Sequence, residues 1–364
     1  MLLMRDGSVW STSVSLPSPP SSGGRYFAQI IQSGATAAAA GDAFCIVLMK
    51  GGGVWAMGRN YHGQLGDGTK VRKRALIFVQ QIVGANAVAA GGGHSMVLTQ
   101  VGHVWTTGWN KYGQLGYGLS SYRTRFMRVI SGGAKAVAAG NAHSILLMQD
   151  SSVWAAGRND NGQLGDGSNT DRRSFVVTMP SSAAAVAAGG LHSMVLTQDG
   201  SVWATGCNEF GQLGDGSRTD KINYVQVVSS GAKAVAAGNR HSVILKKDSS
   251  LWTTGNSFYG QLGDGSRTGS NVFLQVISDG VALVGAGTSH SVMVKHDGSI
   301  WATGSNEYGQ LGDGSTMSVD SFVPSFHNGL RQNAYMLSYA RPGMFLIPRL
   351  LKGTHYFFNG PPIF

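Results

Sequence analysis

Residues 192–217 read HSMVLTQDGSVWATGCNEFGQLGDGS, and residues 290–315 restate them almost unchanged as HSVMVKHDGSIWATGSNEYGQLGDGS. Variants of this stretch surround a tryptophan that returns about every 49 residues along the chain. A repeat of this length excludes heptad, ankyrin and tetratricopeptide arrays, and it leaves longer helical arrays and β-propeller blades. The seven copies carry Trp10, Trp55, Trp105, Trp154, Trp203, Trp252 and Trp301.

Each repeat consists of short apolar runs that turn residues separate. Between Lys135 and Met179 the runs are KAVAAG, HSILLM, SVWAAG and FVVTM, which suit four strands better than two helices. One four-stranded sheet of this size cannot bury both of its faces, so the units should stack side by side around an axis. We therefore predict an all-β fold, a seven-bladed β-propeller of four-stranded blades with repeats of about 49 residues.

The turn between the second and third strands differs from copy to copy. Asp-Gly at 199–200 is typical of a tight hairpin, because such a turn needs positive φ angles that glycine tolerates. Two other copies have Ser-Ser near this point, at 151–152 and 249–250. We expect looser turns in those two blades.

The pattern AGxxHSxxLxxDGxVWxxGxNxxGQLGDG resembles the repeat of the regulator of chromosome condensation family, over about residues 1–325. The resemblance implies a seven-bladed propeller. It also implies two functional classes, because the family includes guanine-nucleotide exchange factors for Ran-type small GTPases. The other class is a propeller that serves as a non-catalytic protein–protein interaction platform.

The two ends of the repeat array differ from its middle. We expect residues 1–327 to form the propeller, with a first blade that lacks its first strand, and residues 328–364 to form a C-terminal tail. The segment Leu330–Ala340 is the best candidate to pair with the first blade and close the ring. A disordered tail is the alternative, since the segment does not restate the repeat.

The amino-acid composition argues against a membrane-spanning protein and against one held together by disulfides or zinc. The chain is 42% apolar and only 13% charged, and no apolar run approaches the roughly 18 residues that a membrane span needs. Cys45 and Cys207 are too few for a disulfide framework or a zinc site, which predicts two buried thiols in a reducing compartment. We expect a soluble monomer in the cytoplasm or the nucleus, with no membrane partner.

The repeated polar residues have structural explanations. A metal ion needs ligands gathered around it, whereas one histidine per blade distributes these side chains around a ring, which favours a hydrogen-bonding role. The adjacent serines should point to the opposite face of the strand, which argues against a Ser–His nucleophile. The tryptophans are expected to anchor blade cores, and the glycines of GQLGDG to form turns between blades. We predict no catalytic site, metal or cofactor, and hence no enzyme. The histidines are His94, His143, His192, His241 and His290.

Function is expected where the copies differ, after each GQLGDG segment. These stretches occupy the same position in each repeat, so they should lie on the same rim of the propeller. The number of Lys and Arg residues in them decreases from the second copy to the last, which predicts a basic arc on one side of that rim. An acidic protein surface, chromatin or nucleic acid would bind there; the alternative is a solvated face that maintains solubility. The arc comprises Lys70, Arg72, Lys73, Arg74, Arg123, Arg125, Arg128, Arg172, Arg173, Arg218 and Lys221.

Between the two functional classes, regular spacing favours the interaction platform. Exchange factors of the family carry an inserted wedge, and the equal intervals between Trp105 and Trp301 leave no room for one. Partner identity stays open, with a small GTPase and an acidic protein surface as candidates. The run KVRKR at 70–74 also resembles a nuclear localisation signal.

Overall fold

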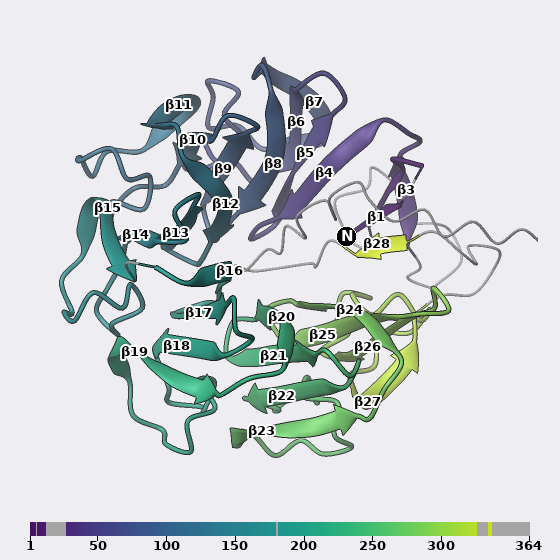
Figure 1. Cartoon of the computed structure of the whole chain (residues 1–364). Helices are drawn as coiled ribbons and strands as arrows, with labels where there is room; N and C mark the ends of the chain where they lie inside the picture. The colour runs from purple at the N-terminus through teal and green to yellow at the C-terminus, as the bar shows by residue number, and fades with distance from the viewer. Residues whose placement is uncertain (5, 12–26, 180, 326–333, 337–364) are drawn as a thin grey trace, which may run out of the picture.

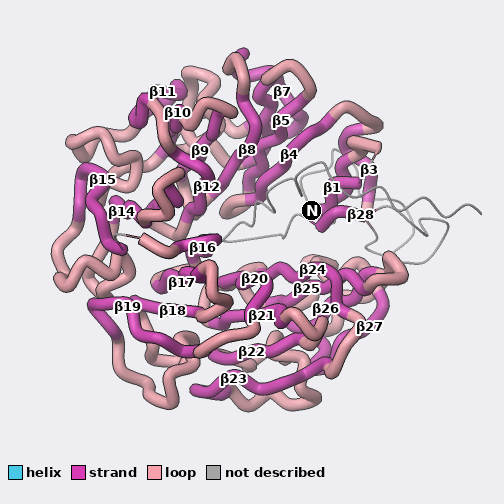
Figure 2. The backbone as a smooth tube through the Cα atoms, in the orientation of Figure 1, coloured by secondary structure: helices cyan, strands magenta, loops and turns pink. Residues whose placement is uncertain are grey.

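The computed structural model describes residues 1–4, 6–11, 27–179, 181–325 and 334–336. Seven antiparallel four-stranded sheets surround a central axis (Figure 1). Strands, turns and loops account for all of the described residues, as Figure 2 shows, and none of them forms a helix that could cross a membrane. The prediction of an all-β, seven-bladed propeller is confirmed.

In blades 2–7 the strands follow one another outward from the axis, so that the first strand is innermost and the fourth lies at the outer edge. Blade 2 holds β4 (Ala35–Ala40), β5 (Phe44–Met49), β6 (Gly53–Gly58) and β7 (Lys73–Gln81). Blade 3 holds β8 (Ala85–Ala90), β9 (His94–Thr99), β10 (His103–Gly108) and β11 (Arg123–Ser131). Blade 4 holds β12 (Ala134–Ala139), β13 (His143–Met148), β14 (Val153–Gly157) and β15 (Arg172–Met179).

The remaining complete blades repeat this pattern. Blade 5 holds β16 (Ala183–Ala188), β17 (His192–Thr197), β18 (Val202–Gly206) and β19 (Lys221–Val228). Blade 6 holds β20 (Ala232–Ala237), β21 (His241–Lys246), β22 (Leu251–Gly255) and β23 (Ser270–Ile277). Blade 7 holds β24 (Val281–Ala286), β25 (His290–Lys295), β26 (Ile300–Gly304) and β27 (Val319–Pro324).

Blade 1 combines strands from both ends of the chain. It consists of β1 (Leu2–Met4), β2 (Val9–Ser11), β3 (Ala28–Ile31) and β28 (Ala334–Met336). The innermost place belongs to β28, which pairs antiparallel with β1 and sets Leu3 opposite Tyr335. Within the segment Leu330–Ala340, only β28 is among the described residues, and the rest of the predicted tail lies outside them.

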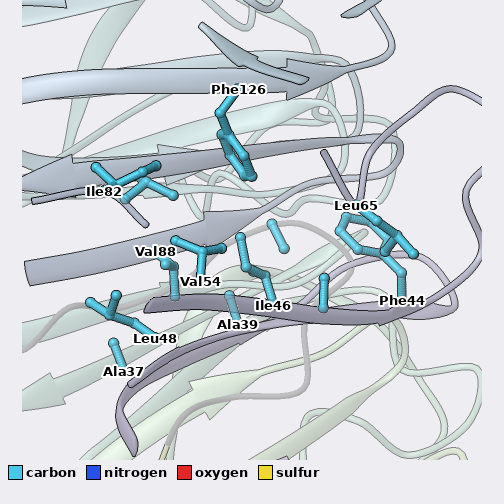
Figure 3. Packing of buried hydrophobic residues seen from close by; sticks show 13 residues of the cluster. Ala37, Ala39, Phe44, Ile46, Leu48, Val54, Leu65, Ile82, Val88 and Phe126 are labelled. Atoms are coloured by element: carbon cyan, nitrogen blue, oxygen red, sulfur yellow. The ribbon is translucent and has the colours of Figure 1, made fainter. Parts of the chain in front are cut away.

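The hydrophobic core lies between blades. Each buried cluster combines residues of two neighbouring sheets; in Figure 3, Ile46 and Val54 of blade 2 pack near Val88 of blade 3. Alanines dominate the first strands, where seven sheets converge and leave little room for larger side chains. Cys45 and Cys207 are buried free thiols.

The tryptophans occupy one position, the second residue of the third strand in blades 1 and 4–7 and the third in blades 2 and 3. They are half-buried, whereas we predicted buried anchors of the blade cores. Trp252, for example, packs against the cluster between blades 5 and 6, while its indole N–H donates to Ser250 Oγ at 2.9 Å. The indole therefore bridges an apolar interface and a polar hairpin, which keeps one edge near solvent.

The repeated histidines connect neighbouring blades. His94 Nε2 lies 2.8 Å from Ser144 Oγ of the next blade, and Ser144 Oγ donates to the Gln114 carbonyl at 2.7 Å. Because the hydroxyl hydrogen is used in that bond, the histidine must be the donor to the serine. The same bonds recur for His143, His192 and His241. A serine that follows a histidine in sequence therefore serves the histidine of the preceding blade.

A glycine three residues before His94, His143, His192 and His241 makes room for each ring. A Cβ at Gly140 would lie 2.1 Å from the imidazole of His143, and blade 2 holds Phe44 over Gly41 in the same arrangement. Burial lowers the pKa of His94, His143, His192 and His290 to about 3, and that of His241 to about 4. These imidazoles are therefore neutral at pH 7.

The turns between second and third strands are equally tight in the copies that lack glycine. Gly200 has a φ of 86°, and Ser151 and Ser249 adopt positive φ angles of 66° and 68°. The amides of all three donate to the carbonyl three residues earlier. The expectation of looser turns at these serines was wrong, because the turn position is one residue earlier than the Ser-Ser pairs suggested, directly after Asp150 and Asp248.

Candidate interaction surface

One face of the ring carries the loops that join third to fourth strands, and we call it the loop face. In the six complete blades these loops have the same length and start directly after the glycine that ends the third strand. They span residues 59–72, 109–122, 158–171, 207–220, 256–269 and 305–318. The predicted basic arc begins in these loops and continues into the fourth strands.

A buried asparagine holds each loop in shape. Asn208 Oδ1 accepts the Leu213 N–H at 3.0 Å, while its Nδ2 donates to Asp215 Oδ1 at 2.9 Å and to the Ser217 carbonyl at 3.2 Å. Equivalent asparagines are Asn60, Asn110, Asn159 and Asn306; blade 6 uses Ser257. The sequence prediction missed this role, although GxNxxGQLG recurs in five of the six loops.

The loop glycines bring each loop against the next blade. A Cβ at Gly211 would lie 2.4 Å from Asn271 Cα, and one at Gly214 would lie 2.4 Å from the Phe273 ring. Both glycines have positive φ angles. Their need for glycine thus has a steric cause and requires no bound phosphate.

Four residues of the predicted arc have partners inside their own blades. Lys73, Arg172 and Lys221 occupy equivalent positions and form ion pairs with Asp67 (3.1 Å), Asp166 (2.6 Å) and Asp215 (3.3 Å). In blade 3 the aspartate is replaced by Tyr117, and the guanidinium of Arg123 lies 4.8 Å from that ring. The charge of these four arc residues is therefore partly engaged within the fold.

The three aspartates have a common electrostatic environment. Burial by itself raises the pKa of their carboxyls, but hydrogen bonds from the following Thr or Ser and from the basic partner outweigh it. The pKa of Asp67, Asp166 and Asp215 is therefore below its ordinary value, and all three are ionised at neutral pH.

The other predicted arc residues are exposed. Arg72 and Arg74 flank the start of β7, and Lys70 Nζ lies 3.6 Å from the ring centroid of Tyr122. Arg128 lies opposite Trp105 in the register of β10 and β11, so it belongs to the outer edge of blade 3. The remaining exposed members are Arg125, Arg173 and Arg218.

Charge divides the loop face into unequal parts when each loop is taken with the first six residues of its fourth strand. Residues 59–78 of blade 2 hold five Lys or Arg and one acidic residue, and residues 109–128 of blade 3 hold four and none. We call these two segments the basic sector. Residues 305–324 of blade 7, the acidic sector, hold three acidic residues and no Lys or Arg.

Aromatic side chains are concentrated on the basic sector as well. The His62 ring stacks on Trp109, with centroids 5.4 Å apart and an interplanar angle of 24°, and Tyr112 meets Trp109 edge to face at 5.4 Å. We call these three residues the aromatic cluster. Sequence reasoning missed it, because the residues belong to two different blades and precede the segments that varied most in charge.

Two models of the regulator of chromosome condensation (RCC1) repeat match the chain, and together they cover more than half of it. The first matches residues 35–64, 86–114, 134–163, 183–212, 232–261 and 281–310. The second matches residues 51–98, 101–147, 150–196, 199–245 and 297–340. No curated protein sequence gave a match.

Solved structures share the fold at low sequence identity. Human WBSCR16 is 22% identical with a TM-score of 0.80, and the alignment covers 93% of this chain and 97% of that one. Yeast RCC1 (Prp20), in a structure with Kap60, is 18% identical with a TM-score of 0.74, covering 86% and 80%. Prp20p from Saccharomyces cerevisiae, solved in a study of its binding to Gsp1p and histones, is 21% identical with a TM-score of 0.69, covering 80% and 76%.

Proposed function

Because the chain belongs to the regulator of chromosome condensation repeat family, we propose that it is a non-catalytic interaction platform whose contact surface is the basic sector of the loop face. The observation that carries this proposal is the uneven charge of loops that share one skeleton. Solubility alone would be served by cations spread over all blades. Their concentration on blades 2 and 3 favours an anionic macromolecular partner.

The repeated histidines support a non-catalytic role. Catalysis by a general base needs a group that substrate can reach and whose pKa lies near the working pH. His94, His143 and His192 are fully buried, bonded to a serine of the next blade, and have pKa values of about 3. Their chemistry is therefore used in holding the ring together.

Exchange of nucleotide on a small GTPase is the competing function, suggested by the yeast relative that binds Gsp1p. Displacing a tightly bound nucleotide calls for an element that protrudes into its phosphate site. The loop-face loops of blades 2–7 all have the same length, and none carries an insertion. We expect no measurable acceleration of GDP release from a Ran-type GTPase in a stopped-flow assay with fluorescent GDP; strong acceleration would contradict the platform.

The platform itself is tested by charge reversal on the full chain. We would measure binding of poly-L-glutamate, a simple acidic polypeptide, to the protein and to the double variant Arg72→Glu, Arg74→Glu. The variant should bind about tenfold more weakly, because two exposed cations become anions at the proposed surface. The matched control is Arg218→Glu, Arg267→Glu, which reverses two charges on the same face in blades 5 and 6. Equal losses in both double variants would overturn the placement of the surface.

A further inference from the structure

The loop face carries half-buried and exposed aromatic rings next to cations, in an arrangement that suits a particular kind of anion. We propose that the basic sector binds single-stranded nucleic acid, with bases stacking on the aromatic cluster and phosphates contacting the surrounding Lys and Arg side chains. This inference rests on the proposed function, since it names the partner class for the same surface.

The aromatic cluster forms a strip that crosses blade boundaries. His62 comes from blade 2, and Trp109 and Tyr112 come from blade 3. Two further rings lie in the loops of the same two blades, where Tyr61 is 61% exposed and Tyr122 is 49% exposed. Successive bases of a single strand can stack on such a series of rings, and each stacked base contributes about 1–3 kcal/mol.

Cations lie next to these rings. The Arg59 guanidinium is 5.7 Å from the Tyr61 centroid, and Lys70 Nζ is 3.6 Å from that of Tyr122. Lys111 and Arg158 both lie 5.4 Å from the centroid of Tyr112. Proteins that bind single strands without sequence preference combine a positive track for the phosphates with aromatic side chains for the bases.

The cations also keep the histidine of the cluster neutral. Burial lowers the pKa of His62, and the charges of Arg59 and Lys70 lower it further. A neutral imidazole can stack on a base through its ring face. It adds no further positive charge that would have to pair with a phosphate at a fixed position. His62 therefore acts as a stacking ring at pH 7.

The acidic side of the face shows that aromatic residues alone do not define the site. Phe258 and Tyr259 of blade 6, and Tyr308 of blade 7, are exposed aromatics in the equivalent loops. Tyr308 follows Glu307 directly, in a loop without Lys or Arg. Repulsion by Glu307 and Asp313 would keep phosphates away from the Tyr308 ring. The loop of blade 6 offers a single arginine, Arg267, against Asp264. Among the described loops of blades 2–7, exposed rings coincide with a large excess of cations only in the basic sector.

The repeat supplies substitutions that the fold already accepts. Trp109→Ser introduces the residue that blade 7 holds at this position, Ser305, and Tyr112→Asn introduces that of blade 4, Asn161. The control variant is Tyr259→Asn, Tyr308→Asn, which removes two exposed rings outside the basic sector. Thermal unfolding at the same midpoint as the unsubstituted protein would establish that each variant is folded.

The experiment measures binding of a labelled oligouridylate of about 12 nucleotides by fluorescence anisotropy, with an RNA duplex of equal length as the second probe. Trp109→Ser, Tyr112→Asn should weaken oligouridylate binding at least about tenfold, through lost stacking. The same variant should bind poly-L-glutamate as the unsubstituted protein does, and the control variant should bind all three probes normally. The duplex should bind more weakly than the single strand, because its bases are already stacked and paired.

The outcomes separate this inference from the proposed function. Tight binding of poly-L-glutamate with weak or ring-independent binding of oligouridylate overturns the inference and leaves an acidic protein as partner. Duplex binding as tight as that of the single strand also overturns it. Failure of both oligouridylate and poly-L-glutamate to bind would overturn the platform as well.

Discussion

The basic sector on blades 2 and 3 and the acidic sector on blade 7 are built on equivalent loops but carry side chains of opposite charge. In both, a buried asparagine, Asn60 or Asn306, accepts a leucine N–H and donates to the aspartate of the turn. The residues that follow the asparagine differ: Tyr61 and His62 occupy the positions of Glu307 and Tyr308 in blade 7. Buried loop positions thus recur because the ring requires them, while exposed positions within the same loop are free to acquire a binding surface.

The largest expected effect is a pH dependence of stability, which tests whether the buried histidines of the different blades behave alike. Each buried histidine has a pKa of about 3 or 4 in the fold and about 6.5 in the unfolded chain. The free energy of unfolding should therefore have its full value above about pH 6.5. It should fall as the pH drops below that value, because the histidines of the unfolded chain take up protons before those of the folded protein. Between pH 7 and pH 5.5 the loss should be about 1 kcal/mol per histidine, or about 5 kcal/mol for the five, by urea unfolding.

A single substitution provides the control for that pH dependence. His143→Phe places in blade 4 the side chain that Phe44 occupies in blade 2, over an equivalent glycine. Over the same pH range, the decrease in the free energy of unfolding should be about one fifth smaller in the variant, because one of the five titrating groups is gone. An unchanged pH dependence would mean that the histidines do not control it.

The second prediction concerns the loop asparagines in the two kinds of blade. Asn110→Ala in the basic sector and Asn306→Ala in the acidic sector should each cost about 2–4 kcal/mol of unfolding free energy, because several buried groups lose a partner. Asn306→Ser should cost less, since blade 6 manages with Ser257. A cost confined to one sector would break the equivalence of the two loops.

The third prediction exchanges one exposed residue between the sectors. Lys111→Glu gives blade 3 the residue that blade 7 has as Glu307. Binding of an anionic partner should weaken severalfold, and the slope of log affinity against log salt should become shallower by about one, because one counterion fewer is released. The reciprocal Glu307→Lys should leave the affinity within about twofold if the acidic sector lies outside the interface.

The smallest expected effect concerns the ion pair that distinguishes the blades at the start of the fourth strand. Asp67→Asn removes the partner of Lys73 but keeps an oxygen that can accept from Asn60, so it should cost only about 0.5–1 kcal/mol. Asp313→Asn should cost less, because Val319 replaces the lysine in blade 7. Equal costs, measured by thermal unfolding at pH 7, would show that the pair contributes nothing.

Local pattern was enough to predict the number of blades, the four strands of each and the glycine turns. Spacing of the tryptophans and alternation of short apolar runs with turn residues reflect constraints inside one repeat, and a repeat is visible in sequence by comparison with its own copies. The basic arc stays a prediction, which rests on the same comparison of the copies with one another. The ion pairs of Lys73, Arg172 and Lys221 were not predicted, because the fold turns toward them the carboxylates of aspartates six residues earlier.

Contacts between blades could not be predicted from one repeat, because they depend on how neighbouring blades pack in the ring. His94 and Ser144 are 50 residues apart, and only the angle at which neighbouring sheets pack brings their side chains within 2.8 Å. The aromatic cluster likewise forms because the loop of blade 2 lies against that of blade 3, which places His62 on Trp109. Sequence periodicity reports what each repeat buries within itself, whereas a surface shared by two repeats arises from their relative orientation, which is a property of the packed whole.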